Sequence, residues 1–165
     1  MGMEADFSIR IASPGDLEMA SVILEEARIW LAARGIDQWT GPFDAAWLAS
    51  KIEAHELFIV ERNAEPVGVF RLLWEDRLFW GDRERGESAY IHSLAIRRSH
   101  AGTGLGSQIL ASIATLARER NRANLRLDCV ASNHRLIAYY QAHAFTPIDT
   151  VTIGDFDMTL MERPL

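Results

Sequence analysis

The feature that most constrains this chain is a glycine-rich turn at positions 102–106, where the sequence reads Gly-Thr-Gly-Leu-Gly. Alternating apolar residues ending at Ile96 precede the turn, and an amphipathic pattern with Leu105, Ile109 and Ile113 on one stripe follows it. Glycine lets the backbone approach a bulky anion closely, and the first N–H groups of a helix attract phosphate. The sequence therefore predicts a strand–turn–helix unit whose turn can hold a phosphate-bearing ligand.

Two well-known nucleotide motifs fit this turn poorly. A Walker A loop ends in Gly-Lys-Ser or Gly-Lys-Thr, and no lysine stands here. A dinucleotide fingerprint needs Gly-x-Gly-x-x-Gly and an acidic residue about 20 residues on, whereas these glycines alternate and Asp128 comes about 24 residues after Gly104. A tight turn that only joins a strand to a helix stays open as the alternative.

The composition fits one domain covering residues 1–165. The chain is 48% hydrophobic and 24% charged, with no repeat or linker-like segment. Strand and helix patterns interleave, so we expect a mixed α/β (α+β) fold with a largely antiparallel sheet and one central strand–helix–strand unit. The expected strands span 7–11, 57–61, 67–74, 90–96 and 125–129, with further strand within 145–162. The expected helices span 14–35, 44–54, 105–116 and 133–143. Residues 76–87 are expected to form an exposed connection.

Charge and cysteine content narrow the class of partner. Seventeen Lys and Arg against 23 Asp and Glu give a net charge of −6, which disfavours a nucleic-acid partner and allows a cationic small substrate. No apolar stretch reaches the ~18 residues needed to span a bilayer, and segment 1–11 lacks a signal-peptide run. The single cysteine, Cys129, forms neither an intrachain disulfide nor a cysteine-rich zinc site, so we expect a cytoplasmic protein with no membrane partner.

Two ordered motifs resemble the GNAT superfamily of N-acetyltransferases. The family's Gln/Arg-x-x-Gly-x-Gly/Ala turn falls on residues 101–106, with Ala101 at the first position. The segment 133–145 looks like the family's Asn…Phe-Tyr-x-x-x-Gly-Phe motif, with Ala144 where glycine is usual, and the stretch 30–39 is also similar. The resemblance implies about seven strands flanked by about four helices, with a splayed strand pair that forms the acetyl-CoA cleft.

The same resemblance implies that acetyl-CoA is the cosubstrate. Its pyrophosphate is expected on the amides of the glycine turn, its pantetheine arm beside Leu94 and Ile96, and Asn133 on the other side of that arm. A backbone N–H near Leu94 is expected to face the thioester carbonyl, where a fixed donor is worth ~3 kcal/mol. The implied coenzyme-binding residues are Leu94, Ile96, Ala101, Gly102, Thr103, Gly104, Leu105, Gly106, Ser107, Asn133 and Tyr140.

The implied reaction is direct attack of an amine on the thioester. Tyr140 occupies the family's general-acid position, although two adjacent tyrosines on a buried helix are also typical of a core. His92 is the first candidate base because its reference pKa lies near neutrality; a purely structural histidine, Asp128 as the base and a water-mediated route are the alternatives. The sequence shows no metal-binding cluster, and Cys129 lacks an obvious partner that would activate it as a nucleophile.

The acceptor is expected to be a small-molecule amine. Its candidate binding residues are Trp39, Trp80 and His92, although most of the tryptophans are expected to be core or loop anchors. Modification of a protein N-terminus or lysine and a non-catalytic acyl-CoA-sensing module are the alternative functions, and a homodimer is compatible with the sequence. The acidic residues available to a cationic amine are Asp37, Asp44, Asp76, Asp82 and Glu84.

Overall fold

The computed structural model describes residues 6–165, and these residues contain a seven-stranded sheet of mixed direction. The strands are β1 (Ser8–Ile11), β2 (Leu57–Arg62), β3 (Glu65–Leu73), β4 (Ser88–Ile96), β5 (Asn124–Val130), β6 (Thr146–Ile153) and β7 (Phe156–Pro164). Their order in the sheet is β1-β2-β3-β4-β5-β7-β6. The β4–β5 pair is parallel, whereas β1–β2, β2–β3, β5–β7 and β6–β7 are antiparallel. The expected mixed, mostly antiparallel sheet is confirmed.

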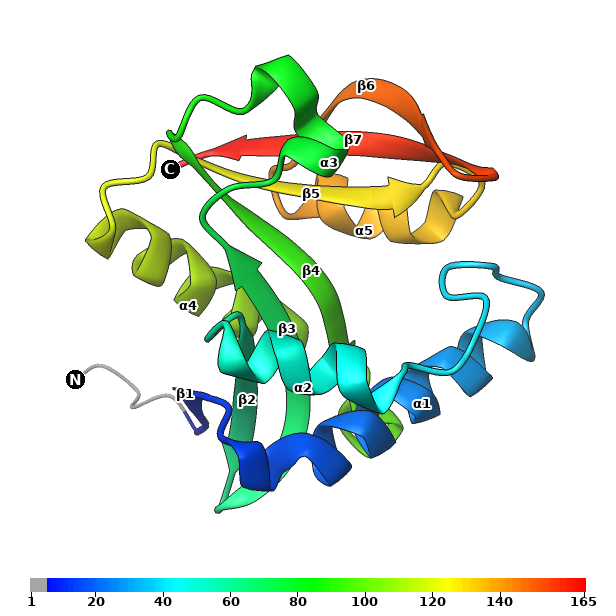
Figure 1. The fold of residues 1–165 in the computed structure, drawn as a ribbon, viewed down its shortest axis with the longest axis vertical. Coiled ribbons are helices and arrows are strands. Elements are labelled where there is room, and N and C mark those ends of the chain that lie inside the picture. The colour runs from blue at the N-terminus through cyan, green and yellow to red at the C-terminus, as the bar shows by residue number, and fades with distance from the viewer. Residues whose placement is uncertain (1–5) are drawn as a thin grey trace. The chain divides into compact units, whose positions relative to one another are not determined.

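Five α-helices accompany this sheet within the described residues (Figure 1). They are α1 (Leu17–Ala32), α2 (Ala45–Glu53), α3 (Arg77–Trp80), α4 (Leu105–Glu119) and α5 (His134–Ala142). Four of them lie at the expected places, although α4 continues beyond residue 116 to Glu119, and α3 is an additional short helix. Across residues 6–165, every helix is too short or too polar to cross a membrane.

Local signals explain several element boundaries. Asp44 caps α2, because its side chain accepts a hydrogen bond of 2.7 Å from the Trp47 N–H. Gly35, after α1, has a φ of +68°, which suits the end of a helix. Asn63 and Ala64 have φ of +53° and +63° between β2 and β3, as a two-residue hairpin turn requires.

The chain divides into two units whose segments alternate along the sequence. The N-terminal unit holds the described part of Met1–Gly35 together with Trp39–Leu72 and Ser93–Gly106. It contains α1, α2, β1, β2 and most of β3, and its core lies where the two helices pack on the strands. Buried residues of that core include Ile23, Leu24, Leu48, Leu57 and Ile59.

The C-terminal unit holds Ile36–Gln38, Leu73–His92 and Ser107–Leu165. In Figure 1, α3 lies in front of its strands β5 and β7, and α5 lies behind them. Trp80, Tyr90 and Leu160 form a buried cluster on the side of α3. A single domain over residues 1–165 stays a prediction.

The prediction of an exposed connection at residues 76–87 holds for most of these residues, which are exposed, but it missed the ordered structure of the segment. This segment folds back as α3 and a 3-10 turn, Gly81–Arg83, and it buries three of its side chains. Asp76, Trp80 and Glu84 are 6%, 2% and 5% exposed, respectively. The polar residues that suggested exposure are instead satisfied internally, because Asp76 caps α3 and Glu84 accepts two backbone hydrogen bonds.

Period-two alternation along residues 90–96 predicts one strand face for Tyr90, His92, Leu94 and Ile96, but β4 does not keep a regular alternation. Ser93 has a φ of +53° inside β4, a left-handed conformation that breaks the alternation of side chains as a bulge does. Ser88, Ala89, Tyr90 and Ile91 are all buried before this residue, whereas Ala95 is the buried residue of β4 after it. The parallel register with β5 ends at the pair Ile91–Leu127, just before Ser93.

Candidate active site

A histidine lies between two carboxylates in the C-terminal unit. His92 Nε2 is 2.8 Å from Asp76 Oδ2, and His92 Nδ1 is 3.5 Å from Asp128 Oδ1. All three side chains are largely shielded from solvent, and the Phe79 ring packs 5.4 Å from the imidazole, centroid to centroid. His92 is therefore held at both ring nitrogens by acidic groups that come from different parts of the chain.

The hydrogen bonds indicate how the imidazole proton is placed. An ionised carboxylate only accepts, so the short contact to Asp76 assigns a hydrogen to Nε2 of His92. In the neutral ring, the lone pair is then on Nδ1, on the side of Asp128. This tautomer can accept a proton next to a negative charge, which is the arrangement that a general base for an amine needs.

The same three residues can also act as ligands of a cation. One ligating atom from each of Asp76, His92 and Asp128 lies within 4.8 Å of the others. The sequence did not indicate this grouping, because Asp76 comes 16 residues before His92 in the segment that was expected to be exposed.

Tyr140 occupies the buried end of α5. Its ring packs against those of Phe145 and Tyr139, with centroids 5.6 and 5.4 Å away. Burial, with smaller contributions from Cys129, Tyr139 and Asp128, raises the pKa of the Tyr140 hydroxyl well above its usual range. The hydroxyl therefore keeps its proton at every ordinary pH and can serve as a donor.

Cys129 is buried in β5 and does not have the properties of a nucleophile. Burial, and then the negative charge of Asp128, raises the pKa of the Cys129 thiol to about 12. Because the thiolate is the reactive form, this side chain is a small apolar group of the core.

The glycine turn presents several backbone N–H groups. Gly102 and Gly104 have φ of +73° and +82°, which other residues rarely adopt, and a Cβ built on either meets no atom within 4 Å. Within residues 6–165, the last turn hydrogen bond before the glycines runs from the Ala101 N–H to the Arg98 carbonyl, at 3.2 Å. The N–H groups of residues 102–104 donate to no described backbone carbonyl. Residues 105–107 form the first turn of α4, and the N–H groups of a first turn have no carbonyl partner within their own helix.

Two hydroxyls of this turn are already engaged. The Thr103 hydroxyl donates to the His100 carbonyl at 2.7 Å, and Ser107 Oγ lies 2.6 Å from His143 Nε2. The backbone amides, rather than these side chains, are therefore the groups of the turn best suited to bind an anion.

Asn133 has a structural role that its motif position did not reveal. Its side-chain oxygen caps α5 by accepting from the Leu136 N–H at 3.2 Å, and its Nδ2 donates to Gln38 Oε1 at 3.3 Å. The expected contact of Asn133 with a pantetheine arm stays a prediction, as do those of Leu94 and Ile96, which are half-buried near the end of β4.

Comparison with known proteins decides the family. Residues 24–145 match the acetyltransferase (GNAT) family. The chain belongs to this family. It is 34% identical over 134 residues to YesJ of Bacillus subtilis, an uncharacterized N-acetyltransferase, and the match covers 76% of this chain and 74% of that protein.

Solved structures share the GNAT fold. A GNAT acetyltransferase from Listeria monocytogenes superposes with a TM-score of 0.80 at 24% identity, over 96% of this chain and 95% of the other. The aminoglycoside acetyltransferase AAC(6')-Ib, solved with coenzyme A, gives 0.77 at 21% identity over 96% and 94%. The ribosomal-protein-S18-alanine N-acetyltransferase of Escherichia coli gives 0.70 at 19% identity over 96% and 93%. The protein is accordingly an acetyl-transferring enzyme with the GNAT fold.

Two expected acceptor-binding residues of this acetyltransferase are packed differently from each other. Trp80 is 2% exposed and packs on Tyr90 and Leu160, with the Arg126 guanidinium 4.4 Å above its ring, so it has the position of a core side chain. Trp39 is half-buried against Phe43, with ring centroids 5.2 Å apart. Asp76, which sequence patterns placed only among several acidic candidates, is the residue in direct contact with His92.

Proposed function

We propose that this GNAT acetyltransferase moves the acetyl group of acetyl-CoA onto the primary amine of a small-molecule acceptor. The acceptor amine attacks the thioester directly in a ternary complex, as in the family that the chain resembles. The observation that carries the proposal is the cluster of His92 with Asp76 and Asp128, which joins a proton acceptor to negative charge.

The amine has to lose a proton before it can attack. An alkylammonium with a pKa of ~10.4 needs about 4.6 kcal/mol to deprotonate at pH 7, since 3.4 units correspond to about 1.36 kcal/mol each. A base within hydrogen-bond reach is suited to take that proton. His92 supplies such a group, with its lone pair at Nδ1.

Asp128 suits the cationic form of the acceptor. An ammonium group that donates one hydrogen to His92 Nδ1 can donate a second to Asp128 Oδ1, because these two atoms are 3.5 Å apart. In this arrangement Asp128 attracts the charged amine and His92 receives the proton. Asp76 keeps Nε2 protonated throughout.

Tyr140 is the proposed donor to the departing thiolate. A thiol of pKa ~8.5 is a stronger acid than any phenol of normal or raised pKa, so complete transfer from Tyr140 is uphill. Tyr140 therefore acts by donating a hydrogen bond that strengthens as the sulfur becomes negative. Bulk solvent then completes the protonation.

The coenzyme end is assigned to the glycine turn. The amides of residues 102–107 fit a diphosphate, since Gly102 and Gly104 have no Cβ and the first N–H groups of α4 face an anion favourably. Leu94 and Ile96 take the pantetheine arm and a backbone N–H near Leu94 polarises the thioester carbonyl in this proposal.

A thiol-release assay tests the function. The purified chain is mixed with acetyl-CoA and a panel of amines (diamines, polyamines, amino acids, aminoglycosides, and peptides with a free N-terminus or lysine), and free coenzyme A is measured. We expect turnover with at least one small amine, and turnover with that amine to fall at least tenfold in His92→Gln. Turnover confined to peptides would instead indicate protein acetylation, and binding of acetyl-CoA without turnover would indicate a sensing module.

A further inference from the structure

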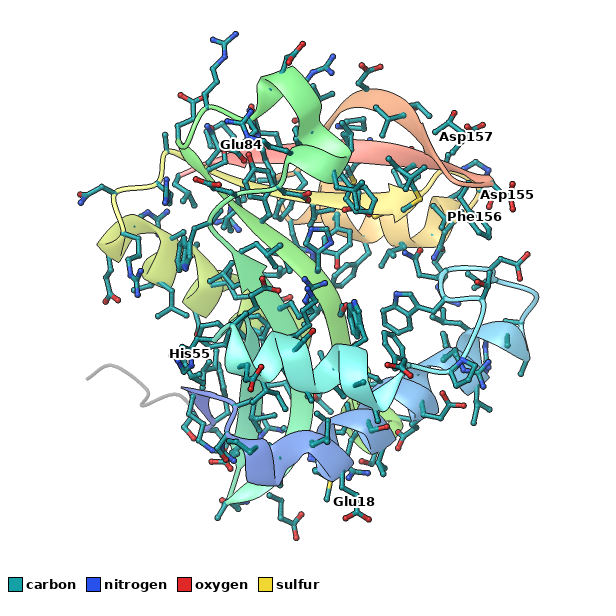
Figure 2. The ribbon with its side chains drawn as sticks, in the orientation of Figure 1. Glu18, His55, Glu84, Asp155, Phe156 and Asp157 are labelled. Carbon is teal, nitrogen blue, oxygen red and sulfur yellow. The ribbon has the colours of Figure 1, made fainter. Side chains whose placement is uncertain are left out.

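A buried carboxylate is linked to the proposed base through Asp76. Glu84, labelled in Figure 2, follows α3 in the segment that leads to β4, and it is 5% exposed. Its Oε2 accepts a hydrogen bond of 3.0 Å from the Asp76 N–H, and its Oε1 accepts one of 2.6 Å from the Gly86 N–H. Glu84 therefore ties together the two ends of the α3 segment.

Burying a charged carboxylate is costly unless it is paired and hydrogen-bonded. Burial alone would raise the pKa of Glu84. Hydrogen bonds from the Tyr90 hydroxyl and from the two backbone N–H groups, together with the positive charge of Arg126, hold the pKa below its usual value instead. Glu84 is thus an anion at neutral pH, and the surrounding groups are arranged for that anion.

Arg126 and Tyr90 are themselves fixed. One Arg126 nitrogen, Nη1, donates to the Tyr90 hydroxyl at 3.1 Å and to the Arg83 carbonyl at 2.8 Å. Arg126 Nε donates to Glu162 Oε2 at 2.7 Å. We call Glu84, Tyr90, Arg126 and Glu162 the Glu84 network; it lies entirely within the C-terminal unit, as do Asp76, His92 and Asp128.

Every polar group of Asp76 is engaged, and the Glu84 network holds its backbone. The Asp76 N–H donates to Glu84, and its carbonyl accepts from the Trp80 N–H at 3.2 Å. On the side chain, Oδ1 accepts from the Phe79 N–H at 3.3 Å, which leaves Oδ2 directed at His92. The direction of Oδ2 is therefore determined by where the backbone at residue 76 is held.

We propose that Glu84 is a positioning residue for His92. By fixing the Asp76 backbone, it keeps Asp76 Oδ2 on Nε2 of the imidazole, and this contact places the lone pair on Nδ1, beside Asp128. The activity part of this inference rests on the proposed role of His92 as the base. The tautomer of His92 is a readout that does not depend on that role.

Glu84→Gln tests the inference. The amide replaces one carboxylate oxygen with an NH₂ group, so the N–H of either Asp76 or Gly86 then faces a donor in place of an acceptor. We expect kcat/KM for the amine to fall about tenfold, and the nitrogen NMR shifts of His92 to change from the Nε2–H tautomer to a mixture of both neutral tautomers. Tyr90→Phe, which removes only the hydroxyl bonded to Glu84, is the milder variant, and we expect the same two changes to be smaller.

Glu56→Gln is the matched control. Glu56 Oε2 accepts from Arg71 Nη2 at 2.7 Å in the N-terminal unit, so this variant weakens the hydrogen bonding of a partly buried carboxylate in the other unit. We expect a comparable loss of thermal stability with an unchanged His92 tautomer and unchanged kcat/KM.

A double variant separates positioning from general stability. If Glu84 acts through His92, then adding Glu84→Gln to His92→Gln lowers the rate no further, because the two changes remove the same function. An unchanged tautomer in folded Glu84→Gln and Tyr90→Phe, or an additive loss of rate in the double variant, overturns the inference. Full activity of His92→Gln would contradict the proposed base, and the NMR tautomer would then decide the positioning role alone.

Discussion

His92 contacts an acidic group at each of its ring nitrogens, so the chemistry of this site depends on which carboxylate takes which nitrogen. The sequence singled out Tyr140 because it occupies a motif position of the GNAT family, and His92 because a histidine on the strand expected beside the thioester is a candidate base. The sequence did not reveal the contact with Asp76, because that contact exists only when α3 folds back over the strands. A polar segment with two glycines carries no sign of that fold, since the burial of Trp80 depends on Tyr90 and Leu160 from other strands.

Asp128 is expected to determine the affinity for the acceptor. Asp128→Asn removes a charge-assisted hydrogen bond to the ammonium group, worth about 1.5–3 kcal/mol, so KM for the amine should rise about 10–100-fold. KM for acetyl-CoA should stay unchanged in steady-state kinetics. Asp82→Asn, which changes an exposed acid of the α3 segment, is the control. A larger effect at Asp82 than at Asp128 would place the acceptor elsewhere.

Tyr140→Phe should preserve coenzyme binding and lower turnover. Removal of the hydroxyl takes away a donor to the developing thiolate, a loss of about 100-fold in kcat. The Kd for acetyl-CoA should change less than threefold by calorimetry. The pKa of Tyr140 is raised well above its usual range, so its hydroxyl stays protonated below about pH 10. Any decline of the wild-type rate in that pH range should therefore remain in Tyr140→Phe. Equal turnover of the two proteins across that pH range would remove Tyr140 from the mechanism.

At the level of helices and strands, most boundaries follow from local chemistry. Asp44 caps α2 and Asn133 caps α5, and short polar side chains are favoured at such sites. The reversal at Ser93 cannot be found that way, since any alternating pattern assumes an uninterrupted strand. Element types were therefore easier to predict than the faces their side chains occupy.

The glycine turn offers a test with an internal control. Gly104→Ala places a side chain at a residue with a φ of +82°, in a region where a Cβ meets no protein atom within 4 Å. Gly154→Ala does the same at a φ of +60° in the turn between β6 and β7. Both variants should lose about 1–2 kcal/mol of unfolding free energy. Only Gly104→Ala should also weaken acetyl-CoA binding, by tenfold or more in calorimetry; equal affinities would argue against a diphosphate on this turn.

The end of α5 is built on an unfavourable residue. The N–H groups of Ala144 and Phe145 donate to the carbonyls of Gln141 and Tyr140 at 3.1 and 3.0 Å, which is the Schellman pattern, and Ala144 has a φ of +67°. Glycine adopts this conformation without strain, although it gains freedom in the unfolded chain. Ala144→Gly should therefore raise the unfolding free energy by about 0.5–1 kcal/mol in urea denaturation. A loss of stability would show that the alanine methyl group makes a compensating contact.

Considered as a whole, the enzyme should be stabilised by its cosubstrate. A ligand at about 100 times its Kd adds about 2.7 kcal/mol to the unfolding free energy, which corresponds to roughly 5–10 °C in Tm for a chain of this size. Thermal denaturation with coenzyme A and with acetyl-CoA measures this shift, and Gly154→Ala should retain it. No shift with either ligand would contradict the cosubstrate assignment.

Ser93 has a left-handed backbone conformation inside β4, so the placement of side chains along this strand depends more on its length than on its composition. His92 and the residues from Leu94 onward lie on either side of Ser93, so inserting one residue beside it would exchange the two faces of everything that follows, whereas deleting Ser93 itself would remove the irregularity and keep those faces. Substitutions along β4 change single contacts, whereas one added residue would misplace every later side chain of the strand at once. Relatives that share this chemistry should therefore tolerate insertions and deletions in the hairpins and avoid insertions in this strand.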